Sequence, residues 1–352
     1  MTGTLPRFIC FCSALLLLFS SFTVAQGPTH HAFVWSASAG MQDLGTLPGY
    51  TSSEAWAINA TGEIAGNSAD AIHAHPHAIF WSPAGGLQDL GTLPNGAWSY
   101  GYGINSAGKV VGISAIASGQ MTLPAHAFLW TKTGGMQDLG TLPGAHNSAA
   151  LAINDSDQVV GNACITGCST LTPTYHAFLW SATGGIQDLG TLGGRSSFAV
   201  AINNVGQVAG YSNPAGSTFY HAFLWTASGG MKDLGTTSPQ ISTIGTGINA
   251  SGNLSVILNK FQAQRAAMWT AAKGYQNIPS LNGSPFNWVA NGINDLNHVV
   301  GSSWITANGP WHAFLWSKAG GSHDLGESFG GMNSYGTAVN ASDEVAGYAD
   351  IN

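Results

Sequence analysis

The sequence predicts an all-β fold, a seven-bladed β-propeller of four-stranded blades. Three observations predict it: a motif that recurs seven times, a composition rich in glycine and poor in charge, and chain ends that hold complementary halves of one repeat. Only 7% of the 352 residues are charged, against about 25% in a typical soluble domain. Glycine supplies 48 residues, which suits strands and tight turns, because glycine and β-branched residues disfavour helix interiors.

The recurring motif is His-Ala-Phe-Leu-Trp or a close variant, spaced 44 to 50 residues apart. Repeats of this length with four short strands match propeller blades. In a strand the His, Phe and Trp of the motif share one face, because successive side chains alternate. Burying the repeated Trp and Phe would stabilise the ring by about 1.5–3 kcal/mol per side chain. The tryptophans are Trp35, Trp81, Trp130, Trp180, Trp225, Trp269 and Trp316.

Each repeat predicts four strands, which we label A to D. Strand A is a small-residue segment such as 197–202, and strand B is a Val-Val-Gly segment such as 158–161. Strand C is the recurring motif, and strand D is the Met-Gln-Asp-Leu-Gly-Thr-Leu segment after it. The small side chains of strand A allow the blades to approach one another around the axis.

The turn between strands A and B is the strongest local signal. Asn begins it in every repeat, and three residues later stands Gly, Asn or Asp, the residues that tolerate left-handed backbone. Asn side chains can also bond back to the turn backbone. The first column is Asn59, Asn105, Asn154, Asn203, Asn249, Asn294 and Asn340, and the second is Gly62, Gly108, Asp157, Gly206, Gly252, Asn297 and Asp343.

The two chain ends complement each other. Residues 31–46 supply strands C and D, and residues 334–347 supply strands A and B. Pairing them completes a seventh blade and leaves no open sheet edge. A β-solenoid, the competing architecture, needs atypical capping repeats at its ends. We therefore expect one seven-bladed propeller domain over residues 26–352.

The N-terminus predicts a secretory signal peptide over residues 1–25. Arg7 gives the positive region, residues 8–19 are apolar, and Thr23-Val24-Ala25 offers small residues for cleavage. The apolar run is too short to span a bilayer. We expect a secreted or extracellular protein with no membrane span after cleavage, and a retained anchor is the alternative. Export makes a disulfide between Cys164 and Cys168 the default expectation.

The charge pattern excludes nucleic acid as a partner. The formal net charge is −7, and residues 26–352 contain no cluster of Lys or Arg. Nucleic-acid binding needs a basic surface that releases counterions from phosphates.

The chain resembles the bacterial extracellular repeat proteins named for the His-Ala-Phe motif. The motif covers nearly all of residues 26–352 and begins at His31, His77, His126, His176, His221, Arg265 and His312. The fifth copy departs most, with Arg265 for the His and Asn277-Ile278-Pro279 for Asp-Leu-Gly. The resemblance implies export and a repeated fold, and it implies no particular activity.

The repeated His is expected to be structural. A catalytic centre needs one copy of a residue, whereas this His recurs in nearly every blade. We expect it to form a buried, satisfied pair with the repeated Asp of strand D.

Functional residues are expected on the face that carries the B–C and D–A loops, because the B–C loops vary in length over a constant scaffold. The binding candidates there are Trp56, Trp98, Tyr100, Tyr102 and Arg195. The catalytic candidates are His73, His75, His146, Glu54, Asp70 and Glu327. His73, His75 and His77 alternate in one extended stretch, which permits a metal site; otherwise no cofactor is expected.

Two functions fit these residues. The first is an exported binding module that holds an extracellular glycan, peptide or protein on the variable face. The alternative is a secreted hydrolase that acts on an ester or polysaccharide in the same place. A Gly-x-Ser-x-Gly nucleophile elbow needs a strand-to-helix turn, which the predicted fold lacks, and a propeller can host either function. A structural surface protein is the third possibility.

Overall fold

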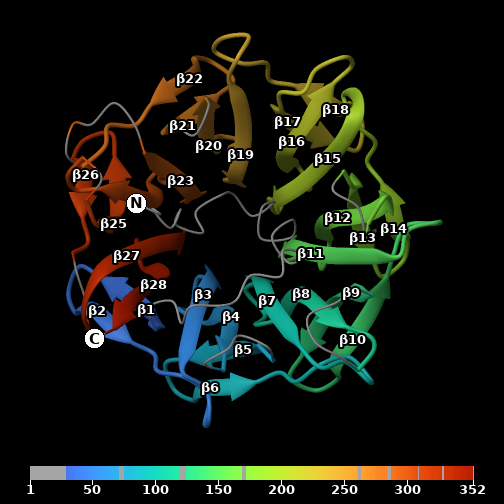
Figure 1. Cartoon of the computed structure of the whole chain (residues 1–352). Helices are drawn as coiled ribbons and strands as arrows, with labels where there is room; N and C mark the ends of the chain where they lie inside the picture. The colour runs from blue at the N-terminus through green and yellow to red at the C-terminus, as the bar shows by residue number, and fades with distance from the viewer. Residues whose placement is uncertain are drawn as a thin grey trace, which may run out of the picture.

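A ring of seven antiparallel four-stranded sheets makes up the computed structural model (Figure 1). The structure describes residues 29–70, 75–118, 124–168, 172–260, 263–281, 283, 287–307, 309–326 and 329–351. In these residues 28 strands form the seven blades. The predicted fold class is confirmed.

The strands of each blade follow the predicted order A to D. Blade one is β3 (Ser52–Ile58), β4 (Ile64–Ala69), β5 (His77–Ser82) and β6 (Gly86–Asp89). Blade two is β7 (Ser99–Ile104), β8 (Val110–Ala115), β9 (Ala125–Thr131) and β10 (Gly135–Gly140). Blade three is β11 (Asn147–Ile153), β12 (Val159–Thr166), β13 (Thr174–Ser181) and β14 (Gly185–Asp188). Blade four is β15 (Gly193–Ile202), β16 (Val208–Pro214), β17 (His221–Thr226) and β18 (Gly230–Asp233). Blade five is β19 (Ser242–Ile248), β20 (Leu254–Lys260), β21 (Ala263–Thr270) and β22 (Gly274–Asn277). Blade six is β23 (Trp288–Ile293), β24 (Val299–Trp304), β25 (Trp311–Ser317) and β26 (Gly321–Asp324). Blade seven is β27 (Gly330–Val339), β28 (Val345–Ile351), β1 (His30–Ser36) and β2 (Gly40–Asp43).

Blade seven closes the ring as predicted. Strand β1 pairs antiparallel with β28, with Phe33 opposite Gly347 and Trp35 opposite Val345. Strand A of every blade lies innermost (Figure 1) and contacts strand A of the next blade, and β27 contacts β3 to complete the circle.

Large side chains fill the space between blades. The repeated Phe is fully buried where it occurs, as in Phe33, Phe128 and Phe178, and the repeated Trp is at most 9% exposed. Each inter-blade layer forms its own apolar cluster, for example Phe178 and Trp180 packed with Val111. Adjacent blades therefore stabilise each other by burial, as the repeat predicted.

The A–B turns adopt the predicted conformation. The second turn column has positive φ in every blade, from 59° at Asp157 to 78° at Gly206. The Asn at the start of the turn accepts backbone N–H groups with its Oδ1, as Asn154 does from Ser156 and Gln158.

The same asparagines also join the blades, which the sequence did not reveal. Each donates its Nδ2 to the backbone carbonyl of the corresponding Asn in the next blade, at 2.9–3.2 Å. Asn340 of blade seven donates to Asn59 of blade one at 3.1 Å, so the bonds form a closed circle. We call this circle the asparagine ring.

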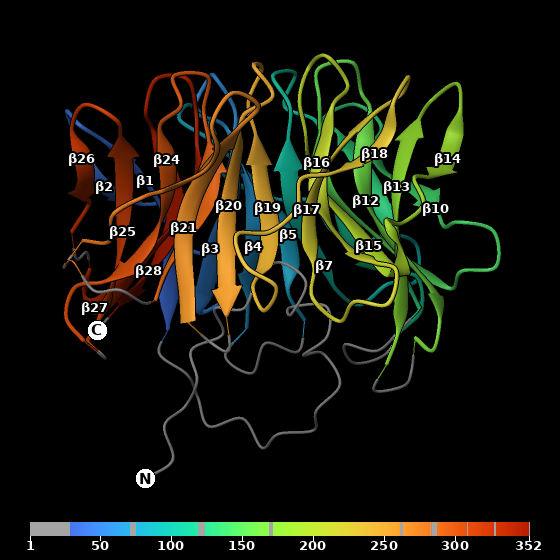
Figure 2. The ribbon, with the colours of Figure 1, turned by 90° about the horizontal axis from the view of Figure 1, so that it is seen from above.

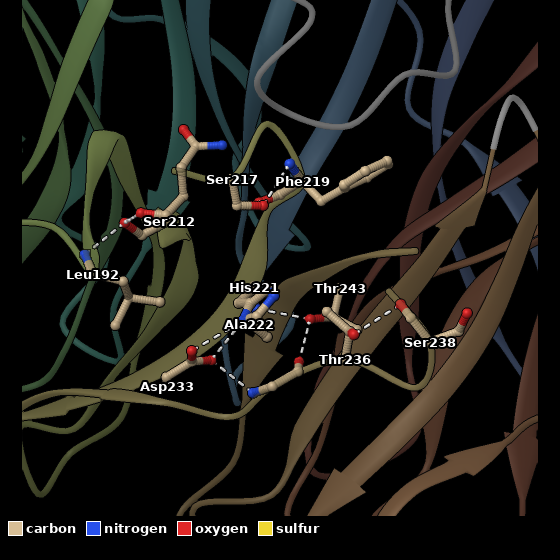
Figure 3. A network of polar contacts seen from close by, with 12 residues as sticks. Leu192, Ser212, Ser217, Phe219, His221, Ala222, Asp233, Thr236, Ser238 and Thr243 are labelled. Carbon is tan, nitrogen blue, oxygen red and sulfur yellow. Dashed lines mark hydrogen bonds and ion pairs between the residues drawn. The ribbon is translucent and has the colours of Figure 1, made fainter. Parts of the chain in front are cut away.

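A second inter-blade contact uses a hydroxyl near the start of strand A. Between blades four and five, Thr243 Oγ1 accepts the N–H of Ala222 at 2.9 Å and donates to the carbonyl of Gly235 at 2.8 Å (Figure 3). A serine makes the equivalent pair of bonds at five other boundaries. In blade six Trp288 takes its place, and its Nε1 donates to the carbonyl of Ile278 at 2.7 Å.

The repeated His pairs with the repeated Asp in the same blade, but the pair is not buried as expected. Six such pairs have Nδ1–carboxylate distances of 2.7–2.9 Å. Figure 3 shows the pair His221–Asp233. The Asp side chains are 38–44% exposed, because strand D is the outer edge of each blade. One oxygen of each Asp also accepts a turn N–H, as at Gly235.

Cys164 and Cys168 form a disulfide with a Cα–Cα distance of 5.8 Å. It lies at the end of β12, and Cys164 is 1% exposed. Among the described residues, no helix has the length and apolar character needed to cross a membrane.

Candidate functional site

The two ends of the ring differ in the loops that they carry. The A–B and C–D turns lie at one end, and the strand ends that lead into the B–C and D–A loops lie at the other (Figure 2). We call the second end the variable face. The predicted candidates on strand A, Glu54 and Tyr100, lie in the half of their strands nearer this face.

A row of aromatic rings crosses three adjacent blades near the inner strands. Tyr100 and Tyr102 of β7 stack with centroids 6.1 Å apart, and Trp56 of β3 lies edge-on to Tyr102 at 6.3 Å. Trp56 also contacts Tyr348 of β28 at 5.7 Å, and Tyr348 contacts Tyr335 at 5.0 Å. These five rings, which we call the inner aromatic cluster, link blades two, one and seven.

A polar network accompanies the cluster. Glu54 Oε1 lies 3.0 Å from His30 Nε2, and its Oε2 accepts a bond from Asn67 Nδ2 at 3.2 Å. Asn67 Oδ1 in turn accepts the Trp56 Nε1–H at 2.6 Å. The side chains of His30 and Glu54 are 16% and 22% exposed. The indole is thereby fixed in orientation, while a carboxylate and an imidazole beside it remain within reach of solvent.

Electrostatics at the cluster favour neutral phenols. Burial raises the pKa of Tyr102 well above its usual value, and the negative charge of Glu54 raises it further. Burial likewise raises the pKa of Tyr335, and Asp350 adds to the effect. Both phenols therefore stay protonated and can donate hydrogen bonds at any physiological pH.

A bulge in strand A places one residue of each blade out of the regular alternation. In blade one the register shifts between Ala55 and Ala57, so that Trp56 is the bulged residue. The equivalent shift in blade two isolates Tyr102. Bulges re-aim side chains and recur next to binding sites. The other bulged residues are Leu151, Val200, Thr246, Asn291 and Thr337.

The opposite half of the ring is packed differently at the same level. The residues equivalent to Glu54 in blades three to six are all at most 5% exposed; they are Ala149, Phe198, Ile244 and Val289. The last three belong to one apolar cluster that includes Tyr211 and Ile257. Partly exposed aromatic and ionisable groups are thus concentrated in blades seven, one and two.

The predicted histidine set is divided between separate partners. His77 Nδ1 pairs with Asp89 at 2.9 Å, and His75 Nδ1 lies 3.3 Å from Asp70. His73 lies outside the described residues. Among the residues that are described, no group of three His, Cys, Asp or Glu side chains is arranged to hold a metal ion.

The remaining predicted residues lie away from the cluster or have structural contacts. His146 is exposed before β11 and contacts no carboxylate in the described part of the chain. Arg195 donates its Nε to Thr174 Oγ1 at 2.9 Å and an Nη2 to the carbonyl of Thr172, so it joins blade four to blade three. Trp98 is 1% exposed and packs in a core cluster with Ile113, so its ring offers no surface to a ligand. Glu327 lies outside the described residues.

Sequence reasoning missed Asn67, Tyr335 and Tyr348. The signal was present in strand B, where the residue after the Val-x-Gly pattern varies most between repeats. That column contains Asn67, Ile113, Asn162, Tyr211, Ile257, Ser302 and Tyr348. Asn67 and Tyr348 are the two members of it that contact Trp56.

The comparisons with known proteins support the fold alone. No family model matches the chain, and no curated protein matches it in sequence. One chain from a structural study of two prolyl endopeptidases gives a TM-score of 0.56 at 10% identity, with coverage of 84% of this chain and 42% of that chain. A protein assigned as TolB from Agrobacterium tumefaciens gives a TM-score of 0.53 at 11% identity, with coverage of 93% of this chain and 99% of that chain. Virginiamycin B lyase from Staphylococcus aureus gives a TM-score of 0.51 at 11% identity, with coverage of 92% of this chain and 100% of that chain. The chain is therefore a seven-bladed β-propeller similar to those of TolB, peptidase and lyase proteins.

Proposed function

We propose that this chain is an exported carbohydrate-binding propeller of the His-Ala-Phe repeat type, with its site at the inner aromatic cluster. The observation that carries the proposal is the asymmetry of the ring. At the level of Glu54, blades three to six pack buried apolar side chains, whereas Glu54 of blade one and Tyr100 of blade two are partly exposed. Trp56, Tyr102 and Tyr348 adjoin them and are partly exposed as well.

The chemistry of the cluster suits a sugar. Aromatic rings stack on the apolar faces of pyranose rings, and nearby polar groups bond the hydroxyls. Here Glu54 and His30 supply an acceptor and a donor beside the Trp56 ring. Because Asn67 holds the indole in place, little conformational entropy would be lost when a sugar stacks on it.

The test is a glycan array followed by calorimetry with residues 26–352. Replacing Trp56 with Ala should weaken binding of the selected glycan by about tenfold or more, the effect of losing one stacking platform. Phe219 is partly exposed on the B–C loop of blade four, on the same face, so Phe219→Ala is the matched control and should bind as the parent does.

Two results would refute the proposal. Equal glycan binding by the Trp56→Ala and parent proteins would place the ligand elsewhere. Turnover of chromogenic esters or glycosides that is lost in a His75→Ala variant would support the hydrolase alternative and locate the chemistry at the Asp70–His75 pair.

A further inference from the structure

A cleft lies between blades five and six, at the end of the ring opposite the variable face. It has a volume of about 370 Å³. Its floor includes Met268 and Trp316, which are 8% and 9% exposed, and Leu296 stands at its edge with 57% exposure. Lys273 and Lys318 line the same cleft. The cleft thus combines an apolar floor with two cationic side chains.

The two lysines have no anionic partner in the part of the chain that the structure describes. Within the described residues, neither ammonium group forms an ion pair or a hydrogen bond. The whole chain has only 9 Lys and Arg residues, so two unpaired cations in one cleft are a marked local concentration of positive charge.

Comparison with the equivalent lysine of blade two shows which contact Lys318 does not make. Lys132 holds the same position in the C–D turn of blade two, where it pairs with Glu63 of blade one at 3.3 Å and lies 4.6 Å from the Phe80 ring centroid. At the boundary of blades five and six, Asn253 replaces the Glu and Met268 replaces the Phe. Lys318 therefore faces an apolar surface like that of Lys132, but without the carboxylate.

A neighbouring substitution accompanies the loss of the carboxylate. A Cβ at Gly108 would lie 2.9 Å from Glu63 Oε2, so a larger residue at that position in the next blade would make the end of the Glu side chain shift. In blade six this position is Asn297, whose Oδ1 accepts bonds from Asn253 at 2.7 Å and Asn249 at 3.0 Å. The asparagine pair fills the space that the glutamate occupies in blade one.

We propose that this cleft binds a small carboxylate that carries an apolar group. The ligand carboxylate pairs with Lys318 and Lys273, as the Glu63 carboxylate pairs with Lys132. Its apolar group lies on Met268, Trp316 and Leu296. The site is independent of the inner aromatic cluster, because it lies on the face formed by the A–B and C–D turns.

The experiment uses phenylacetate as the probe and phenylacetamide as its neutral match, with titration calorimetry and ligand-observed NMR. Phenylacetate should bind and phenylacetamide should not. Lys318→Gln should weaken binding by about tenfold, the effect of losing one charge-assisted bond. Lys132→Gln is the matched control and should leave binding unchanged, because Lys132 already has a carboxylate partner.

A double variant tests the reasoning from the repeat. Asn253→Glu with Asn297→Gly recreates the arrangement of blade one, and the new Glu should occupy Lys318 and abolish phenylacetate binding while the protein stays folded. Equal binding of phenylacetamide, unchanged binding in the double variant, or no binding of phenylacetate up to about 10 mM would each overturn the proposal. The peptide Gly-Gly-Phe, run in parallel, identifies the source: tighter binding than phenylacetate indicates a peptide C-terminus, and weaker binding indicates a free acid.

Discussion

Replacing one member of the asparagine ring with aspartate is the sharpest test of what holds the blades together. Asn154 is 3% exposed, and its Nδ2 donates to the carbonyl of Asn203 at 3.1 Å and to Gln158 Oε1 at 2.8 Å. The variant Asn154→Asp would keep the oxygen that accepts two turn N–H groups. It would lose both donated bonds and place a carboxylate oxygen against a carbonyl.

The expected cost is about 3 kcal/mol near neutral pH. Each lost hydrogen bond contributes about 1 kcal/mol, and the buried carboxylate facing a carbonyl adds a further unfavourable term. Protonation restores a donor to the side chain. The folded state of Asn154→Asp therefore binds a proton more tightly than its unfolded state, so its carboxyl pKa is raised on folding. The destabilisation should shrink as the pH falls below that raised pKa.

The assay is urea denaturation followed by tryptophan fluorescence at several pH values. Asn277 is the control site, because it is exposed and stands where six other blades carry Asp. Asn277→Asp adds the same charge and should change the free energy of unfolding by less than about 0.5 kcal/mol.

A flat result would refute the reasoning. If Asn154→Asp unfolds at the same urea concentration as the parent near neutral pH, the ring contributes little to stability. If the loss is present but independent of pH, it arises from the turn and not from the donated bond between blades.

Three further predictions follow from the same structure. Ser148→Ala should cost about 2 kcal/mol of unfolding free energy by denaturation, because it leaves the buried N–H of Ala127 without its acceptor; a loss below a few tenths would show that the bridge is dispensable. Burial opposes ionisation of Asp155, but hydrogen bonds from Ser106 and Asn204 outweigh it and lower the pKa of its carboxyl. The contribution of Asp155 to stability is present above the unfolded-state pKa of 3.8 and is lost as the pH falls through the folded-state pKa. Asp155→Ala should therefore lower the free energy of unfolding by about 1 kcal/mol near neutral pH and by nothing in strong acid. An equal loss at both pH values would contradict this. Burial raises the pKa of Tyr275 to about 12, so its contribution is full below the unfolded-state value of 10.0 and is lost above it. Tyr275→Phe should reduce the alkaline loss of stability seen by thermal melting, and an unchanged alkaline slope would refute that role.

The fold could be predicted almost completely because the same residues recur at the same turn seven times. The Asn and Gly columns determine hairpin length, hairpin length determines register, and the complementary ends determine closure. The His–Asp pair was predicted correctly, but the predicted burial of the pair was wrong, because which strand forms the outer edge of a blade depends on the three-dimensional arrangement.

The candidate site could be predicted only in part. Glu54 is conspicuous because the equivalent residues of the other blades are uncharged. Trp56 and Tyr102 are conspicuous because the equivalent residues of the other blades are not aromatic. Their contacts with His30 and Tyr348 cross the closure of the ring, where residues far apart in the sequence meet. The cleft at Lys318 was missed because the A–B and C–D turns have constant length, and functional residues were expected only where loop length varies. The changes of residue type at Asn253 and Asn297 were therefore overlooked.

The asparagine ring has a sense of direction. Every side-chain amide donates to the next blade along the chain, and the donation from Asn340 to Asn59 continues the same sense. A circular series of one-way bonds has no first or last member, so every blade boundary carries the same bond at this end of the ring. No blade boundary is therefore a natural starting point for unfolding at that end of the ring. Separation of the blades has to begin at the opposite end or where another tie is altered, and the boundary of blades five and six, with Trp288 in place of a hydroxyl, is such a place.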